Sequence, residues 1–73
     1  MINKKEVAKR LISLRGKKTQ KEVSEGMGIA QSTYAMYETA KRVPTDENKI
    51  RIASYYKKSV QSIFYAQNSH KAI

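Results

Sequence analysis

The chain has 73 residues, 40% hydrophobic and 29% charged, and its 15 Lys and Arg against 6 Asp and Glu give a net charge of +9 at pH 7. It has no cysteine, which excludes disulfides and thiolate chemistry, and no apolar run approaches the ~20 residues that span a bilayer. We therefore expect one small cytoplasmic domain whose first candidate partner is a polyanion.

The first predicted helix spans residues 4–15. Asn3 is a typical N-cap, Glu6 completes a capping box, and Ile2 can pack against Val7 as a hydrophobic staple. The predicted buried stripe consists of Val7, Leu11 and Leu14, with Ala8 and Ile12 beside them. The predicted solvated face consists of Lys4, Lys5, Lys9 and Arg10.

A short basic link, Gly16 to Lys18, leads into the next helix. Two cations directly before a helix N-terminus are typical of a phosphate site, because the free backbone N–H groups there also attract an anion. We interpret Lys17 and Lys18 as phosphate-binding residues. A solvated basic turn is the alternative.

The segment 19–38, TQKEVSEGMGIAQSTYAMYE, is predicted to form two short helices joined by a tight turn. Thr19 and Glu22 form a capping box that starts a helix near Gln20. Gly28 can adopt the left-handed conformation that ends this helix, because it has no Cβ.

The two faces of the second helix of this pair carry different kinds of side chain. At about 100° per residue, the arc facing Val23 and Met27 of the preceding helix holds Ala30, Thr33, Tyr34 and Tyr37, with Ile29 at its edge. The opposite arc holds Gln31, Ser32, Ala35 and Met36. This uncharged face suits the major groove of B-DNA, where Gln can pair with adenine, Ser can donate or accept, and Ala and Met can contact a thymine methyl.

At these residues the chain resembles the Cro and phage-repressor helix-turn-helix family of DNA-binding proteins. The matching motif positions are Gln20, Val23, Gly28, Ile29, Gln31, Ser32, Tyr34, Tyr37 and Glu38. The similarity continues through Lys41, Arg42 and Pro44 to Ile52, Ala53, Val60 and Phe64, and covers roughly residues 7–65. The chain departs from the family at Ser24, where Ala is usual, at Gly26, and at Ala40, where Gly is frequent.

The resemblance implies further roles. Arg15 is expected to pair with Glu38, and Lys41 and Arg42 match basic positions of a loop along the DNA backbone. Arg42 is alternatively a candidate for a narrowed minor groove. The expected phosphate-binding residues are Gln20, Thr33, Lys17, Lys18, Lys41 and Arg42. The expected base-reading residues are Gln31 and Ser32, with Ala30, Ala35 and Met36 shaping the apolar part of the contact.

A fourth helix is predicted after the loop 39–44, with Thr45 as its cap. Its first turn contains Asp46 and Glu47, which complement the helix dipole. The residues expected to face the core are Ile50, Ala53 and either Tyr55 or Tyr56, with Ile52 and Tyr56 in a neighbouring row. Because Lys49 stands where relatives usually have an apolar residue, the start of this helix is expected to be exposed.

A short fifth helix is predicted after its candidate cap, Ser59. Its apolar face consists of Val60, Ile63 and Phe64, at the i, i+3, i+4 spacing. The domain is assigned to residues 1–65, with the motif at 20–38, and residues 66–73 are interpreted as a tail. A dimer-stabilising extension is the alternative for this tail, and His70 within it is assigned no role.

Other classes of function find less support in the sequence. The single His, the lack of Cys and the absence of paired carboxylates outside helix starts argue against an enzyme, a metal site or a cofactor. Five tyrosines suggest stacking on RNA bases, but Tyr34 and Tyr37 fall on the core arc. The apolar stripe of the first helix is required by the core, which argues against a membrane-surface role.

We therefore predict an all-α, compact five-helix domain similar to the lambda-repressor-like DNA-binding fold. The predicted function is sequence-specific binding of double-stranded DNA by a transcriptional regulator, foremost a repressor acting without a cofactor. A homodimer is expected to bind a pseudo-palindromic operator through the recognition helix near residues 29–38. A protein partner of the antitoxin kind is the alternative.

Overall fold

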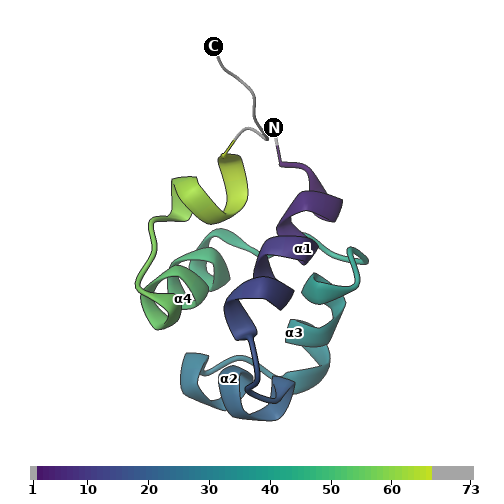
Figure 1. Ribbon diagram of the computed structural model, residues 1–73, viewed down its shortest axis with the longest axis vertical. Helices are drawn as coiled ribbons and strands as arrows, with labels where there is room; N and C mark the ends of the chain where they lie inside the picture. The colour runs from purple at the N-terminus through teal and green to yellow at the C-terminus, as the bar shows by residue number, and fades with distance from the viewer. Residues whose placement is uncertain (1, 67–73) are drawn as a thin grey trace.

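Local sequence signals set the positions of the helices in the computed structural model, which describes residues 2–66 (Figure 1). Within this range the chain forms five helices and no strand: α1 (Lys4–Arg15), α2 (Gln20–Met27), α3 (Gln31–Glu38), α4 (Asp46–Tyr56) and a short π-helical turn, η1 (Gln61–Tyr65). The predicted all-α, five-helix class is therefore confirmed. Residues 67–73, which include His70 and most of the predicted tail, lie outside the described residues.

The predicted N-caps are present. Each side-chain oxygen accepts from a backbone N–H two or three residues on: Asn3 from Lys5 and Glu6, Thr19 from Glu22, Thr45 from Asn48, and Ser59 from Ser62. Such a cap satisfies one of the N–H groups that a helix start leaves without a partner, and typically contributes about 1 kcal/mol.

α2, α3 and α4 each end in the same type of C-terminal turn. In this turn a residue with positive φ reverses the chain, so that the backbone N–H of the next residue donates to a carbonyl in the last turn of the helix. The residues with positive φ are Gly28 (75°), Ala40 (62°) and Lys57 (58°). The returning bonds, each 3.0 Å from N to O, run from Ile29 to Ser24, from Lys41 to Met36 and from Lys58 to Ala53. Gly28 adopts this conformation without a Cβ penalty, whereas Ala40 and Lys57 each carry strain of about 1 kcal/mol.

The core is formed by one face of every helix. Its buried members are Val7, Leu11, Val23, Met27, Ile29, Tyr34, Tyr37, Ile52, Ala53, Ile63 and Phe64. In Figure 1, α1 runs through the centre of the molecule, with α3 on one side and η1 on the other, and α2 packs against both α3 and α4. This packing leaves the far side of α3 at the surface.

Three apolar residues predicted to face the core are exposed. Ile12 is 48% exposed, Ile50 is 63% exposed, and Ala30 is exposed directly before α3. The predictions for Ile12 and Ile50 were wrong because the buried row of each helix is narrower than predicted. It consists of Val7, Ala8 and Leu11 on α1 and of Lys49, Ile52 and Ala53 on α4. The prediction for Ala30 was wrong because Ala30 precedes the first turn of α3, where the helical periodicity does not yet apply.

Lys49 is buried, which contradicts the predicted exposed start of α4. Only 8% of the residue is exposed, and its Nζ donates to Tyr65 Oη at 2.8 Å and to Asp46 Oδ1 at 3.3 Å. The bond to Tyr65 raises the pKa of Lys49, although burial acts in the opposite direction. The apolar stem of the lysine thus fills a core position while its charged end is satisfied.

Arg10 was wrongly assigned to the solvated face of α1. Its Nη1 donates to the carbonyl of Ile63 and its Nη2 to the carbonyl of Ala66, both at 2.8 Å. These carbonyls belong to the C-terminal end of η1, where a helix leaves acceptors without internal partners. Arg10 therefore fixes the last helical turn to α1.

The departures from the family pattern in α2 have packing reasons. Ser24 is fully buried, and its hydroxyl donates to the Lys21 carbonyl at 3.0 Å, so that no polar atom is stranded. A Cβ at Gly26 would overlap the ring of Tyr55 on α4. Glycine at this position therefore allows α2 and α4 to approach closely.

Candidate nucleic-acid interface

The surface side of α3 carries the residues that were expected to read bases. Gln31 and Ser32 are exposed, Ala35 and Met36 are half-buried, and Ala30 is exposed directly before the helix. The single acid of α3, Glu38, is buried. The exposed face of α3 is therefore uncharged, and no carboxylate on it would repel the phosphate backbone.

Two buried tyrosines fix the rotation of α3 about its axis. Tyr34 is fully buried and its hydroxyl lies 2.7 Å from that of Tyr56, while Tyr37 accepts a hydrogen bond of 2.9 Å from Asn48 Nδ2. Both bonds connect α3 to α4. Burial raises the pKa of Tyr34, and the bond to Tyr56 raises it further. Neither ring is accessible for stacking on a base, which disfavours the single-strand alternative at these positions.

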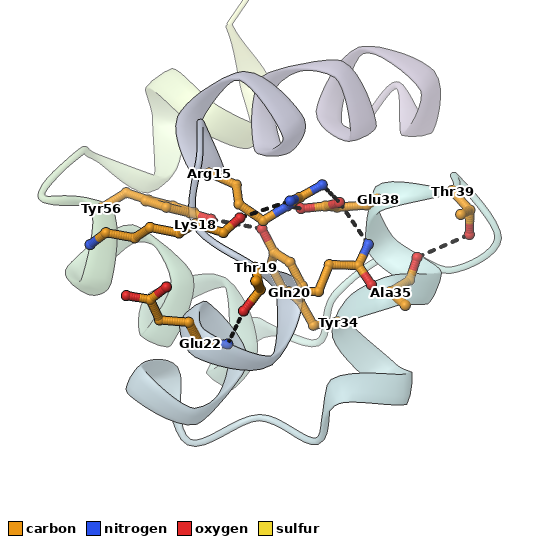
Figure 2. Close-up of polar contacts among 10 residues, drawn as sticks. All are labelled: Arg15, Lys18, Thr19, Gln20, Glu22, Tyr34, Ala35, Glu38, Thr39 and Tyr56. Carbon is orange, nitrogen blue, oxygen red and sulfur yellow. Dashed lines mark hydrogen bonds and ion pairs between the residues drawn. The ribbon is translucent and has the colours of Figure 1, made fainter.

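A three-residue cluster joins the ends of α1, α2 and α3 (Figure 2). Arg15 Nε donates to Glu38 Oε2 at 2.8 Å, and Arg15 Nη2 donates to Oε1 at 3.0 Å. Gln20 Nε2 donates to the same Oε1 at 2.9 Å. Figure 2 shows both donors pointing at the Glu38 carboxylate. The pair expected from the sequence is thus brought together, and Gln20 adds a contact that the sequence did not indicate.

Hydrogen bonding keeps the buried carboxylate of Glu38 ionised. Burial alone would raise the pKa of Glu38, but the bonds from Arg15 and Gln20 outweigh it and hold the pKa below its ordinary value. The bond to Glu38 in turn raises the pKa of Arg15. A charge-assisted, two-armed pair of this kind fixes both side chains.

The expected phosphate-binding residues lie in α2, in α3, and in the two segments that flank this pair of helices. Gln20 lies at the start of α2 and Thr33 is half-buried within α3. The exposed cations stand in the turn before α2, at Lys17 and Lys18, and in the loop after α3, at Lys41 and Arg42. The backbone N–H groups of Lys41 and Arg42 both donate to the Met36 carbonyl, at 3.0 and 3.3 Å, which holds that loop against the end of α3.

Lys18 differs from the other cations because it already has a partner. Its Nζ lies 3.3 Å from Tyr55 Oη and 5.4 Å from the centre of the Tyr55 ring. In Figure 2 its side chain extends away from Glu38 and Thr39 at the end of α3. The sequence did not indicate this contact, because Tyr55 is distant along the chain.

Neither a membrane span nor a metal cluster is found in the part of the chain that the structure describes. No helix there is long and apolar enough to cross a bilayer, and no three His, Cys, Asp or Glu side chains there gather as metal ligands.

The chain matches a known protein family. Residues 10–63 match the family model HTH_3, described as Helix-turn-helix. The matched range holds α2, α3, the Arg15 and Glu38 pair, and the loop with Lys41 and Arg42. No curated protein and no solved structure matches the chain significantly.

Proposed function

Since this chain belongs to the helix-turn-helix family and is therefore a DNA-binding regulator of transcription, we propose that it acts as a repressor. It would do so by occupying an operator in double-stranded DNA and excluding other proteins from it. The supporting observation is the uncharged surface of α3, which two buried tyrosines hold toward the outside of the domain. A rigid helix with a neutral face of small and amide side chains can approach base edges in the major groove.

Base reading is assigned to the exposed start of α3. Gln31 can form two hydrogen bonds with adenine, and Ser32 can donate to or accept from a neighbouring base. Ala30, Ala35 and Met36 provide small or flexible apolar surface for thymine methyl groups. These side chains give the preference among sequences, since phosphate contacts carry no direct sequence information.

Phosphate binding is assigned to residues on either side of the motif: Gln20, Thr33, Lys17, Lys18, Lys41 and Arg42. Gln20 Nε2 has a second N–H besides the one that Glu38 accepts, so it can bind a phosphate without leaving the cluster. Lys18 is expected to contribute less than Lys17, because Tyr55 already holds its ammonium group.

A homodimer on a pseudo-palindromic operator is part of the proposal. One copy presents a single eight-residue recognition helix, which reaches only a few base pairs. Two copies related by a twofold axis would place their helices in successive major grooves on one side of the duplex, about one helical turn apart. Doubling the contacts in this way raises both affinity and specificity.

Selection of bound sequences from a random double-stranded DNA pool tests this function. Affinity for the selected sequence should then be measured against salt concentration, with single-stranded RNA as a competitor. An inverted repeat spaced by about one helical turn is expected. Binding without an enriched motif would contradict sequence-specific repression, and a lack of binding would favour the antitoxin-like protein partner.

A further inference from the structure

A pocket lies between α1 and the C-terminal part of the domain, and its volume is about 270 Å³. It is lined by Arg10, Ser13 and Leu14 of α1 and by Lys58, Ser62 and Ile63 from the end of the chain described here. None of these residues belongs to α2, α3 or the loop after α3. The pocket is therefore separate from the proposed DNA interface.

The lining combines positive charge with an apolar surface. Arg10 and Lys58 are its charged members, and no acid within residues 2–66 lines it. Leu14, which is partly buried, supplies apolar atoms, Ser13 and Ser62 supply hydroxyl groups, and Ile63 is a core residue at the edge of the pocket. We propose that this pocket binds a small organic carboxylate, with the carboxylate at the two cations and an apolar body against Leu14.

Arg10 is held in place to serve as the anion-binding group. Its Nη1 and Nη2 each donate one hydrogen bond to a carbonyl of the C-terminal turn. A guanidinium has five N–H donors, so three remain for a ligand once these two bonds to described residues are counted. Because both carbonyl bonds are already formed, Arg10 loses little side-chain freedom when an anion binds.

The size and the apolar surface of the pocket select the ligand class. Ligand sites commonly have volumes of about 300–1,000 Å³, so this pocket suits a molecule smaller than most drugs, such as benzoate. An inorganic anion would satisfy the two cations but leave the exposed part of Leu14 uncovered. A neutral ring would cover Leu14 but leave the cations without an anionic partner.

A titration of the full, ¹⁵N-labelled chain with sodium benzoate at constant ionic strength tests the proposal. Saturable amide shifts are expected at Ser13, Leu14, Ser62 and Ile63, with a dissociation constant on the order of a few mM. Benzyl alcohol, acetate and inorganic phosphate should each bind at least about five-fold more weakly, because each lacks either the charge or the apolar body.

Two neighbouring lysines provide a matched pair of variants. Lys58→Gln removes a cation that lines the pocket, and Lys57→Gln removes an adjacent exposed cation that does not. Lys58→Gln should weaken benzoate binding about three-fold, whereas Lys57→Gln should leave it unchanged. Equal effects of the two variants, or shifts spread over Lys41 and Arg42 as well, would overturn the proposal. The benzoate titration and the DNA selection test separate sites, so failure of benzoate binding would leave the proposed DNA-binding function standing.

Discussion

The guanidinium of Arg15 and the carboxylate of Glu38 form a two-armed ion pair that joins the last residue of α1 to the last residue of α3. Only 2% of the Glu38 side chain is exposed, against 22% for Arg15. Replacing Arg15 alone therefore leaves a buried carboxylate without a partner. This costs more stability than replacing both members of the pair by apolar residues. The position of the recognition helix depends on this pair.

Arg15→Met should lower the free energy of unfolding by about 2–3 kcal/mol at pH 7. The double variant Arg15→Met with Glu38→Leu should regain part of this loss, because it leaves no unpaired charge. Urea unfolding followed by circular dichroism measures both. A double variant less stable than Arg15→Met would contradict the explanation.

The same pair predicts how stability depends on acid. The folded-state pKa of Glu38 lies below its ordinary value of 4.5, because its bonds from Arg15 and Gln20 outweigh the effect of burial. Its contribution to stability is therefore complete above pH 4.5 and is lost as the pH falls toward the folded-state pKa. The wild type should exceed Glu38→Gln in stability at pH 7, and the difference should narrow below pH 4.5. Urea titrations of both proteins over this range measure it, and a constant difference would count against the depressed pKa.

Ala40→Gly should stabilise the protein by about 0.5–1 kcal/mol. Ala40 has a φ of 62°, a conformation that glycine adopts without the strain that a Cβ causes. Ala35→Gly is the matched control: it lies inside α3, where glycine should destabilise by a similar amount. Thermal unfolding of both variants measures the effect as a change in melting temperature. A lower melting temperature for Ala40→Gly as well as for Ala35→Gly would show that Ala40 is not strained.

Helix starts and the recognition face followed from local rules. The caps at Asn3, Thr19 and Thr45 are decided by hydrogen bonds within a few residues, so the sequence was sufficient to predict them. The buried state of Tyr34 and Tyr37 followed from helical periodicity. These features depend on neighbours along the same helix.

The unpredicted features depend on residues far apart in the chain. Lys49 is buried because Tyr65 accepts from it, Arg10 is bound by the carbonyls of η1, and Lys18 lies over Tyr55. Periodicity assigns a lysine or arginine to solvent unless a distant partner is known. The Gln20 contact was missed for the same reason, because Glu38 approaches it only once the helices have packed.

The division between base reading and phosphate binding can be tested on the selected operator. Gln31→Ala should weaken operator binding by about 1–3 kcal/mol and change binding to random DNA little. Lys41→Ala should weaken both and reduce the slope of log affinity against log salt by about one unit. Fluorescence anisotropy at several salt concentrations separates the two. Equal losses on both DNAs for Gln31→Ala would remove it from the base-reading role.

The two lysines before α2 should differ in their effect on DNA binding, although both carry one charge and both are exposed. Lys17→Ala should reduce the salt slope by about one unit, as expected for a phosphate contact. Lys18→Ala should reduce it by less, because the Lys18 ammonium lies against Tyr55 on α4. Tyr55→Leu separates the causes: it removes the ring and the hydroxyl that hold Lys18, and so should increase the effect of Lys18→Ala on the slope. If Lys18→Ala reduces the slope as much as Lys17→Ala while Tyr55 is intact, the contact with Tyr55 does not persist on DNA, and Lys18 is a full phosphate-binding residue.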